Sequence, residues 1–385
     1  MFTDSSLEAV LNKIPKVRIT VFGDFCLDVY WLLDMDEIEL SVETGLPVRR
    51  VREQRYSLGG AGNAVANLVD LGVGEVRAVG VVGKDLFGAA LLDLLRGRGV
   101  NLDGFEVADH WQTMAYAKPC RGVAEESRID FGAFNLAEPE LQNRLIASLS
   151  AAAKRSDVVI LNQQVPGGLS HPTMIERINA IMTENPQVRF VVDARHYATA
   201  YGPAVFKLNA AEAGIFLGER FEGKLPLAKA QDFVRRIGAK TGNAVFLTRG
   251  EDGILVADGG KVTTIHGLQI VDPIDTVGAG DTVVASLSAA LGSGQDAVTA
   301  AELANVAATV TVRKLHTTGT ASPREIRDAA KDLNYIFEPE LAESPGHAKQ
   351  LPGAEIEIIC ELPPDLAIKH CIFDHDGTLS VLREG

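Results

Sequence analysis

Short runs of apolar residues, rich in β-branched side chains, alternate with longer amphipathic stretches along the first 335 residues. Strands are predicted at residues 17–22, 76–82, 158–161, 190–192 and 244–247. Helices are predicted between strands, for example at 61–71 and 86–95. Continuous apolar strands that alternate with helices are typical of a parallel sheet covered on both faces. The pattern therefore predicts an α/β fold, in which a doubly wound, mostly parallel sheet is flanked by helices.

Two segments break this rhythm. Residues 30–57 and 112–132 alternate between apolar and polar positions and carry no helical pattern. Such alternation is typical of strands with one exposed face. We expect a small accessory sheet there, either a β-sheet lid over a bound ligand or an ordinary edge hairpin.

The composition narrows the class of ligand. The chain has 385 residues, 46% of them hydrophobic, and a net charge of -14. An acidic surface disfavours binding to nucleic acid or to anionic membranes. No apolar run approaches the roughly 20 residues of a membrane span, and the first residues lack the pattern of a signal peptide. Four scattered cysteines without CxxC spacing indicate reduced thiols. We therefore expect a cytoplasmic protein that binds a small molecule.

The strongest chemical signal is the sequence DTVGAGD at 275–281, directly before an apolar helical run. A turn of small residues at a helix start exposes backbone N–H groups, which together with the helix dipole favour a phosphate. The turn from Gly278 to Asp281 is therefore predicted to form an anion hole, with the backbone N–H groups of Ala279, Gly280 and Asp281 as its donors. The carboxylate of Asp281 would repel a phosphate, so its predicted role is to take the proton from an attacking hydroxyl. The alternative is an ordinary helix start with an acidic first turn.

Polar residues after other strands suit a bound sugar. In parallel sheets, ligands bind at the carboxyl ends of strands, where Asp24, Asp28, Asn162 and Asp193 are found. Asp28 could accept hydrogen bonds from two adjacent sugar hydroxyls. The sequence GGAGN at 59–63 opens a helix; Gly59 and Gly60 permit close approach of the backbone, and Asn63 can both donate and accept. The alternatives are a structural glycine pair and a solvated acid.

Two further patterns suit a nucleotide and its metal. Asn209 and Glu212 lie one helical turn apart after Lys207, and such a pair can hold a hydrated Mg²⁺ ion. The sequence TRGEDG at 248–253 follows a strand, and Arg249 could contact phosphates. A helix-capping pattern and a hairpin turn are the alternatives.

Taken together, these motifs resemble the ribokinase-like (PfkB) family of carbohydrate kinases over residues 15–335. The stretch 275–281 matches the family signature DTxGAGD, and the GGxxxN, NxxE and TRGxxG motifs follow the family order. The stretches 304–308 and 318–320 resemble those that line the adenine side. The resemblance implies an ATP- and Mg²⁺-dependent kinase that acts on a sugar hydroxyl. It implies nucleotide contacts from Lys207, Asn209, Thr248, Arg249, Gly250, Gly253, Asn305 and Gly319, and metal contacts from Asn209, Glu212 and Asp275. A bound K⁺ ion near this loop and a homodimer formed through the lid are further options.

Within the family, the chain is most similar to heptose 7-phosphate kinases. Residues 23–30 resemble their GDxxLDxY start, and residues 46–48 and 128–131 resemble their PVPV and RxDF segments, which gives Arg128 a role in substrate binding. Residues 162–164, NQQ, depart from their SDY-type segment. The expected substrate is a sugar or sugar phosphate, with heptose 7-phosphate phosphorylated at C1 as the leading candidate. A nucleoside kinase of the same fold and a non-catalytic sugar-phosphate-binding regulator are the alternatives.

The pattern changes after residue 335. Residues 336–365 are rich in Pro, Gly, Glu and Ala, which is typical of a linker. A predicted strand at 366–373 then leads into DHDGT at 374–378. This resembles the first motif of haloacid-dehalogenase-type phosphatases, and implies Asp374 as nucleophile and Asp376 as acid/base. We expect 366–385 to be the truncated start of such a domain, with a chance match in a tail as the alternative.

Overall fold

The computed structural model describes residues 4–331, apart from 35–38, 123, 167, 222, 269, 271–272 and 315–317, together with two short strands further on. The chain divides into two compact units, Met1–Phe337 and Glu338–Gly385. In the second unit, β16 (Lys349–Gln350) pairs antiparallel with β17 (Glu357–Ile358) inside the expected linker. The expected phosphatase segment 366–385 lies outside the described residues.

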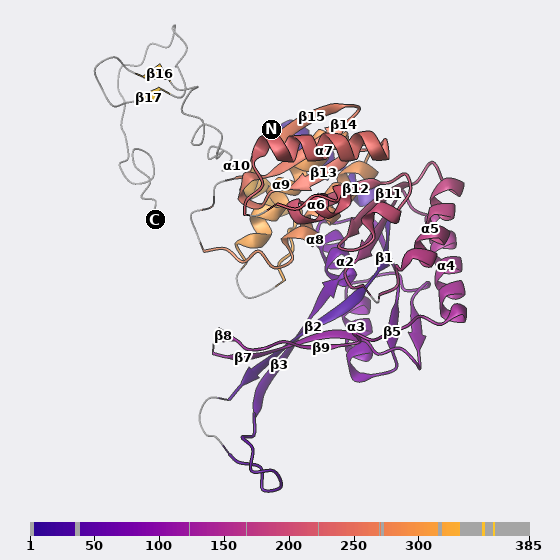
Figure 1. Ribbon diagram of the computed structural model, residues 1–385, viewed down its shortest axis with the longest axis vertical. Coiled ribbons are helices and arrows are strands. Elements are labelled where there is room, and N and C mark those ends of the chain that lie inside the picture. Colours follow the sequence, from indigo (N-terminus) through magenta and orange to yellow (C-terminus); the bar gives the residue numbers. More distant parts are fainter. Residues whose placement is uncertain are drawn as a thin grey trace. The chain divides into compact units, whose positions relative to one another are not determined.

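An eight-stranded sheet forms the centre of the first unit (Figure 1). Its order is β15-β14-β13-β12-β11-β10-β1-β4, and every pair from β4 to β13 is parallel. β14 and β15 add an antiparallel edge. The strands are β1 (Arg18–Gly23), β4 (Glu75–Val79), β10 (Val158–Gln163), β11 (Arg189–Ala194), β12 (Val205–Asn209), β13 (Val245–Thr248), β14 (Ile254–Asp258) and β15 (Lys261–Ile265). The predicted fold class is confirmed.

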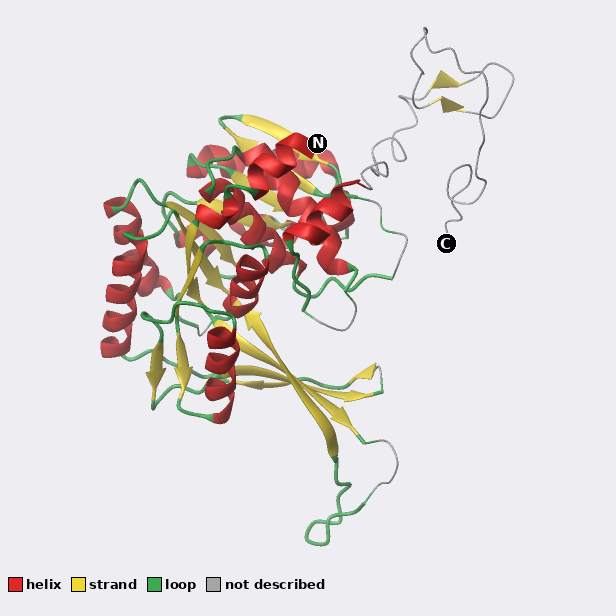
Figure 2. Ribbon diagram, turned by 180° about the vertical axis from the view of Figure 1, so that it is seen from behind, coloured by secondary structure: helices red, strands yellow, loops and turns green. Residues whose placement is uncertain are grey.

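Helices cover both faces of this sheet (Figure 2). In β10, Val158 and Ile160 pack into one apolar cluster, whereas Val159 and Leu161 pack into another. Neighbouring residues of a strand point to opposite faces, so a strand covered on both sides must be apolar throughout. Burial of each such side chain stabilises the fold by about 1.5–3 kcal/mol.

Each cluster has its own set of helices. The first contains residues of α1 (Asp4–Leu11), α2 (Ala61–Asp70), α3 (Leu86–Gly97), α8 (Ala279–Gly292), α9 (Ala297–Val312) and α10 (Pro323–Lys331). The second contains residues of α4 (Pro139–Ala153), α5 (Pro172–Glu184), α6 (Ala210–Leu217) and α7 (Leu227–Thr241). No helix in the described part of the chain is long and apolar enough to cross a membrane.

A separate five-stranded sheet, here called the lid, projects from the body of the first unit (Figure 1). Its order is β3-β2-β7-β8, with β9 paired to β7. The strands are β2 (Phe25–Leu33), β3 (Val51–Gly60), β7 (Met114–Arg121), β8 (Ala124–Glu125) and β9 (Ile129–Phe131). The accessory sheet is therefore present, but β2 begins earlier than residue 30. As a result, Asp28 lies within a lid strand, opposite Ser57 of β3 and Tyr116 of β7.

One predicted strand is divided. Residues 76–82 were expected to form one strand, but β4 ends at Val79 and β5 (Val81–Gly83) pairs with β6 (Glu106–Ala108) in another sheet. Gly80 separates them, and a Cβ there would lie 2.4 Å from the ring of Phe25. The base of the lid thus occupies the space beside Gly80, a tertiary contact that the local apolar pattern does not reveal.

Candidate active site

Four elements bring polar side chains together at one edge of the central sheet. The parallel strands β10, β11 and β12 end at the same edge, with Asn162, Asp193 and Lys207 near their carboxyl ends. Helix α8 begins here with Gly278 as its N-cap, which places Asp281 in the first turn. This is the position at which open α/β sheets bind ligands.

Asp281 is held by α2, the helix that directly follows lid strand β3. Asn63, at the start of α2, donates a hydrogen bond from Nδ2 to Oδ2 of Asp281 over 2.7 Å. Burial and the nearby carboxylate of Asp193 raise the pKa of Asp281 to about 7, against the opposing effects of Asn63, Lys207 and Arg195. A base works best when its pKa lies near the working pH, so this carboxyl group is suited to accept a proton at neutral pH.

The hydrogen bond between Asn63 and Asp281 leaves no space for a side chain at Gly278. Its φ of 81° is one that other residues rarely adopt, and a Cβ there would lie 2.8 Å from Nδ2 of Asn63. The turn before α8 is therefore pressed against the side chain that holds the base.

The predicted anion hole is smaller than expected. The N–H of Ala279 donates to the carbonyl of Thr276, and that of Asp281 donates to the carbonyl of Gly278. The first turn of α8 thus uses two of the three expected donors itself. The N–H of Gly280 has no acceptor among the described residues, and a Cβ at Gly280 would lie 3.1 Å from Nζ of Lys207. The groups that remain available to hold an anion here are the Gly280 N–H and the nearby Lys207 ammonium group, which together form the candidate anion site.

Lys207 is held in place by Asp193 and Asn162, for which the sequence predicted only a position at the end of a strand. Its buried Nζ donates to Oδ1 of Asp193 over 2.9 Å, and Nδ2 of Asn162 donates to the other oxygen of Asp193. Burial lowers the pKa of Lys207, but Asp193 and Glu212 outweigh it and leave the pKa above its ordinary value. Lys207 therefore stays charged. Asn162 and Asp193 come together because they pair across β10 and β11, which single-sequence motifs do not show.

The two residues of the expected magnesium pair form a helix cap. Oδ1 of Asn209 accepts from the N–H of Glu212, and Oε2 of Glu212 accepts from the N–H of Asn209. An amide oxygen has two lone pairs, so the expected metal contact of Asn209 stays a prediction. Burial raises the pKa of Glu212, and Lys207 opposes this effect. In the described part of the chain, no cluster of three His, Cys, Asp or Glu residues could hold a metal. Mg²⁺ usually keeps several waters and uses one or two carboxylates, so a hydrated ion near the second oxygen of Glu212 fits this site.

Asp275 shapes the turn before α8. Its Oδ1 accepts from the N–H of Val277 over 3.0 Å, and its own N–H donates to the carbonyl of Val312 at the end of α9. The expected metal contact of Asp275 stays a prediction.

An apolar pocket of about 410 Å³ adjoins the anion site. Four residues expected on the nucleotide side line it, namely Thr248, Gly250, Gly253 and Asn305. Apolar walls come from residues such as Ile254, Leu268, Val283, Ala308 and Val312, and Ala279 and Gly280 line its phosphate end. Pockets of this size with a few polar groups are typical of small-molecule sites. The pocket can hold the base and ribose of a nucleotide.

Two of the expected nucleotide contacts outside this pocket are engaged with other protein atoms. The guanidinium of Arg249 pairs with the buried carboxylate of Asp252 at 3.2 Å, and Lys224 pairs with the same carboxylate at 2.9 Å. Gly319 is buried against α9, where a Cβ would lie 2.9 Å from Cγ2 of Thr311. Arg249 is thus committed to an ion pair and Gly319 to packing.

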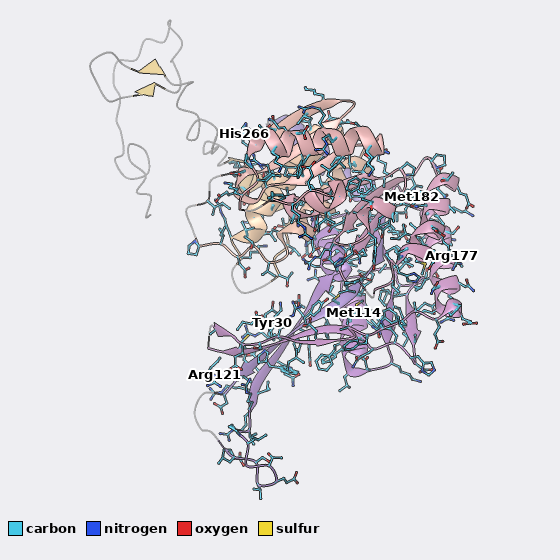
Figure 3. All side chains as sticks on the ribbon, viewed as in Figure 1. Tyr30, Met114, Arg121, Arg177, Met182 and His266 are labelled. Atoms are coloured by element: carbon cyan, nitrogen blue, oxygen red, sulfur yellow. The ribbon has the colours of Figure 1, made fainter. Side chains whose placement is uncertain are left out.

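Two ion pairs of the lid region include expected substrate residues. Oδ1 of Asp28 lies 3.1 Å from Nζ of Lys118, and both side chains are about 10% exposed. Nζ of Lys118 also lies 3.2 Å from the hydroxyl of Tyr30, which is labelled on the lid in Figure 3. Burial lowers the pKa of Lys118, but Asp28 and Tyr30 together outweigh this effect, and the pKa is raised. Lys118 was missed because an alternating strand gives no motif.

Arg128 forms the second pair. Its guanidinium donates two hydrogen bonds to Asp130, at 2.6 and 2.8 Å, and lies over the ring of Tyr116 at 4.5 Å. Asp28 contributes to the raised pKa of Arg128, after the larger effect of Asp130. The expected substrate residues Asp28 and Arg128 therefore share one region of the lid.

Three other expected substrate residues have supporting positions. The buried carboxylate of Asp24 accepts backbone N–H groups from Gln164, Val165 and Leu169, at 2.8, 3.1 and 2.9 Å. A Cβ at Gly59 would lie 3.0 Å from Oδ2 of Asp28, and one at Gly60 would lie 2.5 Å from the carbonyl of Asp24. Asp24 therefore anchors the loop after β10, and the glycines make room for Asp28 and Asp24; their expected part in substrate binding stays a prediction.

Comparisons with known proteins agree with this geometry. The model of the pfkB family of carbohydrate kinases matches residues 19–324. The chain is 29% identical over 321 residues to the "Bifunctional protein HldE" of Hydrogenovibrio crunogenus; the match covers 83% of this chain and 64% of that protein. The phosphofructokinase-2 of Escherichia coli in complex with potassium superposes with a TM-score of 0.68 and 17% identity, over 82% of this chain and 99% of the other. Arabidopsis thaliana ribokinase complexed with ribose and ATP gives a TM-score of 0.63 and 17% identity over the same shares.

Proposed function

The chain belongs to the pfkB family of carbohydrate kinases, and we propose that it transfers the γ-phosphoryl group of ATP to a hydroxyl of a sugar phosphate. The observation that carries the proposal is the position of Asp281. Its carboxyl group, with a pKa of about 7, lies beside an anion site made by Gly280 and Lys207. A base next to an anion site suits transfer of a phosphoryl group to an alcohol.

In the proposed mechanism, Asp28 accepts hydrogen bonds from sugar hydroxyls and the ion pair with Lys118 holds that carboxylate in place. Asp281 accepts the proton of the attacking hydroxyl. The Gly280 N–H and the Lys207 ammonium group hold the transferring phosphoryl group, where fixed donors stabilise developing charge. The lid excludes water from the reacting groups.

The lid also supports a phosphorylated acceptor. Lys118 and Arg128 place two cations near Asp28. Although Arg128 pairs with Asp130, its side chain is 48% exposed and can also reach a ligand, and guanidinium groups bind phosphate through paired hydrogen bonds. Together with the resemblance of residues 23–30 and 128–131 to heptose 7-phosphate kinases, this favours heptose 7-phosphate as acceptor, with phosphorylation at C1.

Magnesium and potassium belong to the proposal as ions bound with the substrates. Mg²⁺, when bound with ATP, neutralises charge on its phosphates, and Glu212 would hold its water shell. The loop 275–278 is the proposed neighbour of a K⁺ ion, and the phosphofructokinase-2 of Escherichia coli was solved in complex with potassium.

A homodimer through the lid is the proposed assembly. Side chains on the lid and the segment that leads into it, such as Val48, Val51, Tyr56 and Ile129, are between 38% and 47% exposed. A second copy would cover these apolar groups. Light scattering of the parent and of a Val51→Glu, Ile129→Glu double variant tests this, with a shift to monomer expected in the variant.

Release of ADP across a panel of acceptors tests the function. The panel contains hexoses, pentoses, fructose phosphates, nucleosides and heptose 7-phosphate, each with Mg²⁺ and with K⁺ varied. Turnover should be greatest with heptose 7-phosphate and should require Mg²⁺. Preference for a nucleoside, or binding without turnover across the panel, would contradict the proposal.

A further inference from the structure

The side-chain amide of Asn63 has one orientation that its neighbours accept. Asn67 lies one turn later on α2, and its Nδ2 is 3.0 Å from the main-chain carbonyl of Asn63 and 3.2 Å from its side-chain Oδ1. A main-chain carbonyl can only accept hydrogen bonds, so the Asn67 atom that faces it must be the nitrogen. That nitrogen also needs an acceptor in the Asn63 side chain. Oδ1 of Asn63 therefore faces Asn67, and Nδ2 faces Asp281.

A hydroxyl on α8 fixes the other end of Asn67. Once the nitrogen of Asn67 faces Asn63, its Oδ1 faces Thr282, whose Oγ1 lies 2.9 Å away and donates to it. Oγ1 of Thr311, on α9, lies 3.1 Å from Oγ1 of Thr282. Asn63, Asn67, Thr282 and Thr311 are each at most 2% exposed. Bulk water therefore does not compete for these bonds, and a reversed amide would leave buried groups unpaired.

We propose that Asn67 and Thr282 are positioning residues, which hold the amide of Asn63 with its nitrogen against Asp281 and its oxygen away from it. If the amide were reversed, Oδ1 of Asn63 would face the carboxylate, and two acceptors would meet without a hydrogen between them. That arrangement would favour protonated Asp281, which cannot act as a base. The catalytic meaning of this inference rests on the proposed function, in which Asp281 is the base.

The charged groups around Asp281 stay the same when either uncharged residue is replaced. Asp193 of β11 raises the pKa of Asp281, whereas Lys207 of β12 and Arg195, after β11, lower it. The thiol of Cys26, on β2, is also near Asp281. Burial raises the pKa of this thiol well above its usual range, and the negative charge of Asp281 adds to that effect. A change in the titration of Asp281 in an Asn67 variant therefore reports the Asn63 amide rather than a changed charge.

Titration of Asp281 by carbon-13 NMR, with aspartate labelled at Cγ, tests the inference without any acceptor. The Asp281 signal is assigned by its loss in Asp281→Asn, and it should stand apart because ordinary Asp side chains titrate near about 3.9. In Asn67→Leu the midpoint should rise by about 0.5–1 pH unit, because a carboxylate that loses a hydrogen-bond donor is less stable in its charged form. Thr282→Val should move the midpoint in the same direction by less, and Thr282→Ser should restore the parent value.

Asn185→Leu is the matched control. Asn185 is 3% exposed, and its Nδ2 donates to the carbonyl of Ile181, four residues earlier, over 2.8 Å. This is the bond that Asn67 makes to the carbonyl of Asn63, but at the end of α5, so the midpoint of Asp281 should not move. Equal midpoints in the parent and Asn67→Leu would overturn the inference. If Asn67→Leu does not fold, equal midpoints in Thr282→Val and Thr282→Ser would overturn it. Parent-like turnover in Asp281→Asn would instead refute the proposed function and leave the amide orientation intact.

Discussion

Nδ2 of Asn63 lies 2.7 Å from Oδ2 of Asp281, although the two residues are 218 positions apart in the chain. This hydrogen bond joins the start of α2 to the first turn of α8. Helix α2 directly follows lid strand β3, and α8 adjoins the proposed nucleotide pocket. It is the point at which the GGAGN motif at 59–63 and the DTVGAGD motif at 275–281 meet. Three of the predictions below follow from the surroundings of this bond.

Gly278→Ala should reduce turnover by about 10-fold or more, since forcing atoms into a packed site costs roughly 1–3 kcal/mol. The new Cβ would lie 2.8 Å from Nδ2 of Asn63 and would push it away from the base. Gly294→Ala is the matched control, because Gly294 has a φ of +83° against +81° for Gly278 and nothing within 4 Å of its Cβ position. Steady-state kinetics and thermal unfolding of both variants separate the two effects. Equal losses of turnover would show that backbone strain, rather than contact with Asn63, is responsible.

The pH dependence of kcat/KM should show an acid limb near pH 7. Burial and Asp193 raise the pKa of Asp281 to about 7, and a base works only when it is deprotonated. Activity should therefore fall about tenfold per pH unit below that value and level off above it. A profile that stays flat down to pH 5 would mean that the ionisation of Asp281 does not control the reaction.

Lys118→Met should raise the KM of the acceptor by about 10-fold or more and leave the KM of ATP within about 2-fold, because hydrogen bonds to charged groups are worth about 1.5–3 kcal/mol. Without Lys118, the carboxylate of Asp28 would be left largely buried without its cation. Lys84→Met is the control, since Lys84 is 77% exposed and pairs loosely with Asp109. An effect on the KM of ATP alone would place Lys118 outside the sugar site.

Ala308→Phe should weaken the binding of ATP. Ala308 lines the apolar pocket, and a phenyl ring there would fill space assigned to the nucleotide. The KM of ATP should rise by about 10-fold or more, on the usual cost of overpacking, while a fluorescent acceptor analogue still binds. The exposed Ala151, on α4, provides a control as Ala151→Phe. Unchanged affinity for ATP in Ala308→Phe would show that the nucleotide lies elsewhere.

Much of the fold could be predicted from the sequence because its signals are local. The strand at Val158–Leu161 is apolar throughout because it is covered on both faces, and the glycines at 278 and 280 mark a turn before a helix. The division of residues 76–82 into β4 and β5 could not be predicted, because it depends on the ring of Phe25 beside Gly80.

The candidate site was predicted in part for the same reason. Asp281 and Asn63 carry motifs that are visible in the sequence. The sequence does not show how backbone groups are used, so the donors of Ala279 and Asp281 were overestimated, and the capping box of Asn209 and Glu212 could not be distinguished from a metal site. Lys118 was missed because its role depends on pairing between β2 and β7.

The most direct test of the central claim is the turnover of Asp281→Asn with heptose 7-phosphate, measured beside its affinity for ATP. The amide can still accept the hydrogen bond of Asn63 but cannot take a proton. Loss of a general base reduces rates by about 10²–10⁴-fold, so kcat should fall by that factor while the Kd of ATP stays within about 2-fold. A kcat within a few-fold of the parent, with ATP still bound, would contradict the assignment of Asp281 as the base.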